Sequence, residues 1–498
     1  MRPAGRIMRP TGRTTQAPPW MPLLPENKDC SMPKKPLSER SWYPNYVLAV
    51  LLLAYIFSFI DRQILSLMVV PIRRDLAITD FQMSLLQGTA FALLYSVMAL
   101  PIARLADAYS RRTIISSGIA LWSLMTAGCG LARSYGALFL MRVGVGVGEA
   151  ALSPAAYSLL SDYFSKQRLA RAVAIYSLGI SLGSGLAYLA GGLLMEAVSK
   201  ISVIELPLLG AMKSWQVVFI VVGLPGLLIA LLMAYISEPA RRGALHDASG
   251  QRQKLKMRET LSFLLARWRL YLVFPIATGF LGIFSFGLMA WYPTFLIRTF
   301  GMSIGESGIY FGLTYLIVGT LGTYSGARFA EKLQHKYPDI HIRFVMISAL
   351  VMVVPSVLGP LMPSAPLALA MLIPTIFLKC SYYGSTGSAM QLVTPNQMRA
   401  QVSALQIFFG NIIGLAVGAS SIAALNDFVF HDDNAIHFSL ALVAGTSCVG
   451  GALLLASCLK PYRRALLEAR TVEETAHASD DDARTRTNSA CDNAMAKS

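Results

Sequence analysis

Twelve apolar runs of about 20 residues each dominate this sequence of 498 residues. Each run is long enough to cross the hydrocarbon core of a bilayer as a helix. The chain is 54% hydrophobic and only 14% charged, with a mean hydropathy of +0.53. We therefore predict an all-α, multi-pass membrane protein, with spans near 45–71, 81–103, 112–132, 135–163, 168–196, 215–237, 270–297, 305–328, 341–361, 366–392, 398–425 and 436–459.

Basic residues gather in alternate connections between these runs and account for the formal net charge of +16. One side carries the termini, the segment 238–269 and the basic connections near 104–112, 166–171 and 328–343. Loops rich in Lys and Arg stay in the cytoplasm, so we expect both termini to be cytoplasmic, in a bacterial plasma membrane. The charge then reflects topology, and no nucleic-acid partner is expected.

Polar segments lie outside the spans. We expect 1–44 to be a disordered cytoplasmic N-terminus without a signal peptide, 238–269 a basic cytoplasmic linker, and 460–498 a disordered cytoplasmic tail. The six cysteines have no CxxC or metal-ligand spacing. The sequence therefore predicts free cysteines, no bound metal and no cofactor.

Four ionisable residues fall deep inside predicted spans: Asp61 and Arg62 in the first, and Arg142 and Glu149 in the fourth. An intramembrane charge is costly unless it has a partner or faces a water-filled cavity. Counting from the span ends places Asp61 and Glu149 at similar depth, so the four form a balanced set. A proton-coupling site and a static ion-pair network both fit this pattern.

Two internal repeats divide the chain. Residues 103–107 (ARLAD) match 327–331 (ARFAE) at an offset of 224. Small residues recur every fourth position in the fifth span and in the eleventh, which permits close helix packing. We therefore predict two related six-helix halves, 45–237 and 270–459, around a central cavity. The packing ladders are Gly179 and Gly183, and Gly410, Gly414 and Gly418; the charged joints of a cytoplasmic gate are Arg104, Asp107, Arg111, Arg112, Arg328 and Glu331.

The second half has one central charge, Lys379, in the tenth span. It is too far from either end to reach water by snorkelling, so an anionic partner is expected. That partner is either a substrate or one of the acids of the first half. The other candidate cavity residues are Tyr382, Tyr383, Asn411 and Trp291.

The motifs of the first half resemble the major facilitator superfamily and, within it, the Spinster-like transporters. The superfamily feature is ARLADAYSRR at 103–112, and the Spinster features are FIDRQ at 59–63, GIALWSLMT at 118–126, MRVGVGVGEA at 141–150 and GSGLAYLAGG at 183–192. This resemblance implies a twelve-helix major facilitator fold and proton-linked alternating access for amphipathic solutes, lipid-like in some relatives. It also implies that Asp61, Arg62, Arg142 and Glu149 form the set that couples transport to protons. Because a low-dielectric cavity disfavours an ionised carboxylate, whereas Arg62 favours the ionised form of the adjacent Asp61, we expect Glu149 to cycle the proton.

Other functions are less consistent with the sequence. It lacks a Walker A phosphate loop and the HExxH motif, which argues against ATP-driven transport and against a zinc enzyme of the HExxH type. A non-transporting receptor remains an alternative. Within carriers, the choice lies between lipid-like amphiphiles and small anionic metabolites such as sugar acids. We expect a monomer whose partners are its substrate, protons and membrane lipids.

Overall fold

The computed structural model describes residues 42–199, 204–206, 210–239, 257–334, 336–395 and 398–495, and nearly all of them are helical. Residues 1–41 of the predicted disordered N-terminus therefore lie outside the described residues. Among the described residues, ten helical stretches are long and apolar enough to cross a membrane. The predicted twelve are completed by α4, which carries Arg104 and Asp107 near its end, and by α5, which begins with Arg111.

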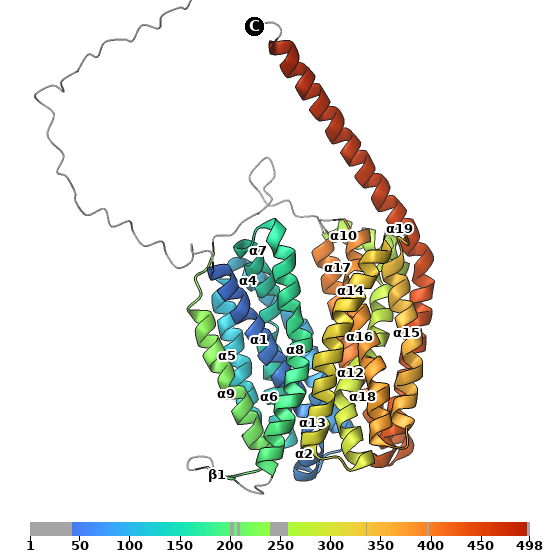
Figure 1. The fold of residues 1–498 in the computed structure, drawn as a ribbon. Coiled ribbons are helices and arrows are strands. Elements are labelled where there is room, and N and C mark those ends of the chain that lie inside the picture. The colour runs from blue at the N-terminus through green and yellow to red at the C-terminus, as the bar shows by residue number, and fades with distance from the viewer. Residues whose placement is uncertain are drawn as a thin grey trace, which may run out of the picture. The chain divides into compact units, whose positions relative to one another are not determined.

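The N-terminal half contains the first six crossings (Figure 1). They are α1 (Tyr43–Leu67) with the short α2 (Val69–Leu76); α3 (Asp80–Ser84), η2 (Leu85–Thr89) and α4 (Ala90–Ala108); α5 (Arg111–Cys129); α6 (Tyr135–Glu149) and α7 (Leu152–Tyr163); α8 (Lys166–Ser199); and α9 (Ser214–Ala234). A small antiparallel hairpin, β1 (Ile204–Leu206) and β2 (Gly210–Met212), connects α8 to α9.

The C-terminal half repeats this plan after the linker helices α10 (Met257–Ala266) and α11 (Trp268–Tyr271). Its crossings are α12 (Val273–Phe300); α13 (Ile304–Leu313), η3 (Thr314–Gly319) and α14 (Thr320–Gln334); α15 (Ile340–Leu358) with η4 (Gly359–Leu361); α16 (Ala365–Val393); α17 (Arg399–Phe409), η5 (Gly410–Ala416), α18 (Val417–Ala424) and η6 (Leu425–Phe430); and, after η7 (Asp433–Ala435), α19 (Ile436–Met495).

Two local features differ from the sequence-based expectation. The fourth crossing is interrupted by a turn at 150–151, directly after Glu149. The tail predicted to be disordered from residue 460 instead continues α19 to Met495 (Figure 1). This segment contains no glycine and no proline after Pro461, so nothing in it stops a helix.

The glycine ladders pack helices within each half. A Cβ on Gly183 of α8 would lie 2.8 Å from the Phe59 Cβ on α1, and one on Gly418 would lie 2.6 Å from the Ile283 oxygen on α12. Corresponding helix pairs of the two repeats thus approach closely at the same place. Gly410 was predicted to belong to the ladder, but a Cβ there would meet nothing within 4 Å, so it faces open space and does not pack.

Other glycines bring the two halves together. A Cβ on Gly312 of α13 would lie 2.7 Å from the Leu189 nitrogen of α8, and one on Gly88 of η2 would lie 2.5 Å from the Leu415 oxygen of η5. We call the end of the bundle that carries α2 the α2 end, and the end that carries α10 the linker end (Figure 1). Both contacts lie toward the α2 end, and the two halves therefore meet there.

Candidate functional site

An ion pair lies inside the N-terminal half, at the interrupted fourth crossing. The Arg62 guanidinium pairs with the Glu149 carboxylate, whose side chain is almost completely buried. Ser58 donates a second hydrogen bond of 2.8 Å to the same Glu149 oxygen. The rings of Phe91 and Tyr95 lie 4.2 and 5.6 Å from the guanidinium carbon. Glu149 is therefore held at a fixed place by one arginine and one hydroxyl.

Arg142 and Asp61 lie behind this pair, and both are buried. Arg142 donates a hydrogen bond of 3.1 Å to the backbone oxygen of Asp61, and its charge acts on the Asp61 carboxyl electrostatically. One carboxyl oxygen of Asp61 has no partner among the described residues. The four predicted charges thus lie together, with Arg62 and Glu149 as the direct pair.

Tyrosines surround an open space between the two halves. On the N-terminal side the rings of Tyr55 and Tyr176 stack with centroids 4.6 Å apart, and Tyr157 packs edge-on against Tyr176. On the opposite side Tyr383 of α16 is 62% exposed, yet lies within electrostatic range of Tyr157 and Arg62. A side chain can be this exposed inside the bundle only if it faces a solvent-filled cavity.

Glycines show which way this central cavity opens. A Cβ on Gly387 or Gly410 would meet nothing within 4 Å. Gly387 lies one helical turn after Tyr383, in the part of α16 that runs to the linker end. The cavity therefore opens toward the linker end, while the close glycine contacts close the α2 end.

Lys379 lies one helical turn before Tyr383, on the same face of α16. It is 8% exposed and donates a hydrogen bond to the Tyr315 hydroxyl of η3. Among the described residues it has no carboxylate within 4 Å. The structure thus leaves Lys379 without the acidic partner that was one of the two expectations.

Two predicted cavity residues are core residues instead. Trp291 is fully buried and donates to the Ala419 oxygen, and Tyr382 is buried in the same hydrophobic core. The sequence places them near the middle of their spans but does not fix which helix face looks inward. Asn411 lies in η5 and is partly exposed.

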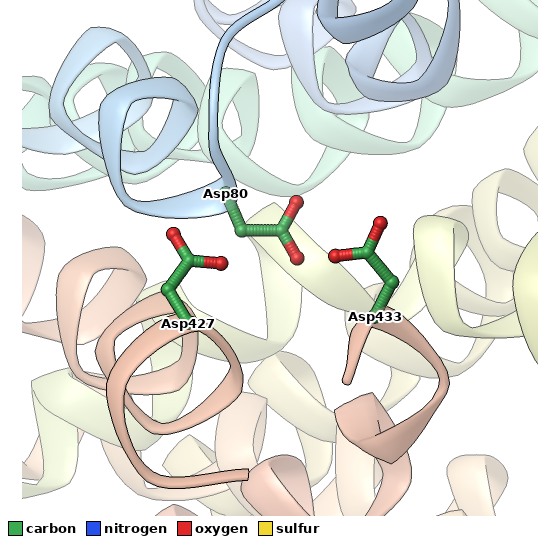
Figure 2. Close-up of side chains that lie close together, drawn as sticks. All are labelled: Asp80, Asp427 and Asp433. Carbon is green, nitrogen blue, oxygen red and sulfur yellow. The ribbon is translucent and has the colours of Figure 1, made fainter. Parts of the chain in front are cut away.

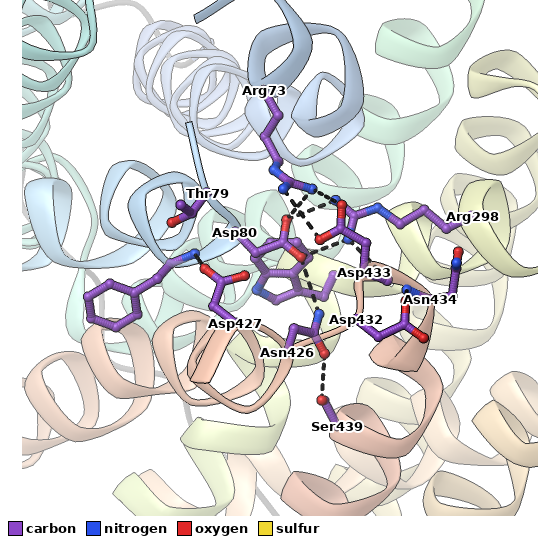
Figure 3. Close-up of polar contacts among 12 residues, drawn as sticks. Arg73, Thr79, Asp80, Arg298, Asn426, Asp427, Asp432, Asp433, Asn434 and Ser439 are labelled. Atoms are coloured by element: carbon purple, nitrogen blue, oxygen red, sulfur yellow. Dashed lines mark hydrogen bonds and ion pairs between the residues drawn. The ribbon is translucent and has the colours of Figure 1, made fainter. Parts of the chain in front are cut away.

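The α2 end contains a polar network that sequence reasoning did not identify (Figure 3). Asp80 of α3 is fully buried and accepts hydrogen bonds of 2.7 and 2.8 Å from Arg298 of α12. Arg73 pairs with Asp80 at 3.0 Å and with Asp433 at 2.9 Å. Asn426 adds a hydrogen bond of 3.2 Å to Asp80. Because Arg73 and Asp80 belong to one half and the other three residues to the other, these bonds join the halves.

Three carboxylates at this end lie as close together as the ligands of a metal ion. Oxygens of Asp80, Asp427 and Asp433 lie within 4.8 Å of one another (Figure 2). However, both Asp80 oxygens already accept from guanidinium groups. Two arginine charges beside the cluster also oppose a cation. The network is therefore better described as a latch of ion pairs, and we call it the α2 latch.

At the linker end the predicted gate arginines make contacts within the N-terminal half. Arg111 pairs with Asp162 of α7 and with Glu238, and the Arg112 backbone N–H donates to Glu238 at 3.0 Å. Burial opposes ionisation of Glu238, but hydrogen bonds from Arg112, Arg111 and Ser110 outweigh it and lower the pKa of Glu238. We call this group the N-terminal clasp.

The C-terminal half has a corresponding clasp with the charges exchanged. Asp339, just before α15, pairs with Arg343 and with Arg463 of α19. Burial would raise the pKa of Asp339, but hydrogen bonds from Arg463 and Arg343 hold it below its ordinary value. Of the other predicted gate residues, Arg104 is exposed, Arg328 lies 5.7 Å from the Tyr324 ring, and Glu331 lines a separate cavity. The side chain of Asp107 lies outside the described residues.

Comparison with known proteins identifies the class. The family model of the Major Facilitator Superfamily matches residues 51–419, and the chain therefore belongs to this superfamily. Its members are transporters, so the protein is a membrane transporter and not an enzyme.

The individual relatives place it beside the Spinster proteins. An MFS-type efflux pump of Mycolicibacterium smegmatis is 27% identical over 86% of this chain and 95% of that protein. Human protein spinster homolog 1 is 25% identical over 87% of this chain and 85% of that protein. A solved bacterial homolog of the human lysosomal transporter Spinster, inward-facing and unoccupied, superposes with a TM-score of 0.72 at 27% identity, covering 86% of this chain and 99% of that one. Within the superfamily, the chain is therefore similar to the Spinster transporters.

Proposed function

We propose that the protein is a proton-coupled secondary transporter that moves an amphipathic or organic anion by alternating access. The observation that carries this proposal is the Arg62–Glu149 ion pair beside the central cavity. An ionised Glu149 holds the arginine, whereas a protonated Glu149 leaves the guanidinium free for an anion. Proton binding and anion binding then favour each other, which is the coupling that symport requires.

The charge balance of the cavity favours an anion. Two acids, Asp61 and Glu149, face three bases, Arg62, Arg142 and Lys379, which leaves about one net positive charge. Protonation of Glu149 raises this to about two. Charge-assisted hydrogen bonds from a partly desolvated guanidinium or ammonium group are the strong ones, so an anionic group is the solute end that this site holds best.

The tyrosines account for the proposed preference for a substrate with an apolar part. Rings such as Tyr55, Tyr157 and Tyr383 offer flat apolar faces with polar edges, which suit a ligand that is both apolar and charged. An amphipathic anion therefore fits this tyrosine-lined surface better than a purely hydrophilic anion does. A small organic or sugar acid is the second candidate, because the charges alone would also bind it.

The proposed cycle uses the two ends of the bundle in turn. The positive-inside rule supports a cytoplasmic linker end, in the bacterial plasma membrane that we propose for this protein. The described conformation, closed by the α2 latch, then faces the cytoplasm. Opening to the other side requires the latch to break and the linker end to close around the substrate.

Transport in proteoliposomes tests the proposal. The purified protein, which we propose to be a monomer, is given a pH gradient and a panel of lipid-like and small organic anions, and substrate and proton fluxes are recorded together. We expect anion flux that follows the pH gradient in the wild type. Glu149→Gln should retain counterflow and lose its response to the gradient.

The matched control is Glu468→Gln, the same chemical change at an exposed ion pair with Arg267. It should leave both fluxes unchanged. If Glu149→Gln kept the full pH dependence, Glu149 would not carry the proton. If no member of the panel exchanged in counterflow, the receptor alternative would take precedence.

A further inference from the structure

A second cavity of about 490 Å³ lies in the C-terminal half alone. Its lining comes from α14, α15, α16 and α17 and does not include the Arg62–Glu149 pair. The volume falls within the range of small-molecule sites, roughly 300–1,000 Å³. The polar side chains in its wall are Glu331, Gln334, His341, Ser385, Gln391 and Arg399.

Two of these side chains are buried and incompletely bonded. Ser385 is 2% exposed and His341 is 7% exposed, and neither the Ser385 Oγ nor the His341 Nδ1 has a partner among the described residues. The His341 Nε2 lies 3.4 Å from the Gln334 Oε1, an acceptor. Nε2 therefore carries the hydrogen of a neutral ring, and Nδ1 is left to accept. Buried polar groups are usually satisfied, so this wall is suited to a polar ligand.

The cavity also holds two opposite charges that do not pair. Glu331 lies on α14, within electrostatic range of Arg328, and Arg399 begins α17. Within the described parts of the chain, neither forms an ion pair of 4 Å or less. The Arg399 Nε donates to the Thr394 oxygen at 3.2 Å. In the two clasps at the same end, by contrast, acids and arginines pair directly. An anion would be repelled by Glu331 and a cation by Arg399, so a ligand with both charges fits best.

In the N-terminal half, a long side chain fills the space that corresponds to this cavity. There Arg111, at the start of α5, reaches Ser158 at 3.1 Å and Asp162, and it is fully buried. His341 is near the start of α15, the corresponding helix of the second repeat. The side chain of His341 is shorter than that of Arg111, so the cavity stays open and Ser385 of α16 has no hydrogen-bond partner among the described residues.

We propose that this cavity binds a small zwitterion, with the ammonium group toward Glu331 and the acid group toward Arg399. Ser385 and Tyr383 are two residues apart and point to nearly opposite faces of α16. A ligand in this cavity therefore touches the helix that forms the wall of the central cavity, from its other side. The site is separate from the proposed transport function.

Binding to the purified full-length protein in lipid nanodiscs tests the proposal. Titration calorimetry would compare a series of zwitterions with increasing charge separation: glycine, β-alanine, γ-aminobutyrate and 6-aminohexanoate. Butyrate and butylamine are matched probes that keep only one charge. We expect saturable binding of at least one zwitterion, and binding at least tenfold weaker for the single-charge probes.

Variants assign the binding to the cavity. Glu331→Gln and Arg399→Gln should each weaken zwitterion binding at least tenfold, while Lys332→Gln, an exposed neighbour of Glu331, should not. Thermal unfolding without ligand checks that each variant is folded. Glu149→Gln should bind normally, which separates this site from the transport site. Absence of saturable binding across the series, equal binding of butyrate or butylamine, or binding unchanged in both cavity variants would overturn the proposal.

Discussion

Asp80 accepts hydrogen bonds from both terminal nitrogens of Arg298, and these two residues belong to different halves of the transporter. The pair is bidentate and almost fully buried, which makes it specific in geometry as well as strong. Because the two residues must separate when the α2 end opens, the free energy of this contact contributes to the preference for the closed α2 end.

Arg298→Gln should therefore shift the population toward an open α2 end. A hydrogen bond to a charged group contributes about 1.5–3 kcal/mol, equivalent to roughly a tenfold or larger shift. The measurement is alkylation of a cysteine placed at Ser420, which meets Ser84 of the other half at 3.3 Å. Lys213→Gln is the control, because that lysine forms an exposed pair with Asp75 within one half. Unchanged alkylation in Arg298→Gln would show that the latch does not set the equilibrium.

Lys379→Gln should weaken binding of anionic substrates and spare neutral analogues. Lys379 has a tyrosine hydroxyl rather than a carboxylate as its partner, so its charge is available to a ligand. Loss of one charge-assisted hydrogen bond corresponds to about 10- to 100-fold in affinity. Competition against a transported ligand measures the effect, with Lys460→Gln, an exposed lysine, as the control. Equal weakening of anionic and neutral ligands would argue for a structural role.

Alanine substitutions should separate packing glycines from those that face open space. Gly183→Ala and Gly418→Ala place a methyl group 2.8 Å and 2.6 Å from atoms of the partner helix. The helices must then move apart, and we expect slower transport with normal membrane insertion. Gly410→Ala meets nothing within 4 Å and should behave as the wild type. The same transport rate in all three variants would contradict this interpretation of the ladders.

Asp339 should make the stability of the C-terminal half depend on pH. Because its pKa in the folded protein lies below the ordinary value of 3.8, its contribution is complete above that value and is lost as pH falls further. At pH 7, Asp339→Asn should lower stability by about 1–3 kcal/mol. Thermal unfolding in detergent should show the difference from wild type shrinking below about pH 4.

Two arginines at the start of the tail provide the comparison for this prediction. Arg463→Gln removes the partner of Asp339 and should reproduce part of the loss at pH 7. Arg464→Gln changes the neighbouring exposed residue and should not. A stability difference between wild type and Asp339→Asn that stayed constant down to pH 3 would contradict the assignment.

The sequence was sufficient to predict the twelve crossings, because the length of each apolar run is set by the bilayer. It also identified Arg62 and Glu149, since a charge at membrane depth needs a partner and few residues qualify. It did not distinguish Trp291 and Tyr382, which pack in the core, from Tyr383, which faces the cavity. In a span that is apolar on all sides, periodicity does not show which face looks inward.

The α2 latch could not be predicted from the sequence for a different reason. Asp80 and Arg298 are 218 residues apart, and each lies near a span end where charged residues are common. Nothing local marks them as partners. Similarly, the empty corner beside His341 depends on the reach of one side chain compared with that of Arg111, which only the three-dimensional packing reveals.

The exchanged charges of the two clasps distinguish the helix ends of one half from those of the other. In the first half the base, Arg111, begins α5, and the acid, Glu238, follows the sixth crossing. In the second half the acid, Asp339, precedes α15, and the base, Arg463, follows the last crossing. If the third crossing of one half met the last crossing of the other, Arg111 would face Arg463, or Asp339 would face Glu238. Both mismatches put like charges together. Like charges therefore disfavour packing between helices of different halves, whereas opposite charges favour packing within each half, although the two halves are related in sequence.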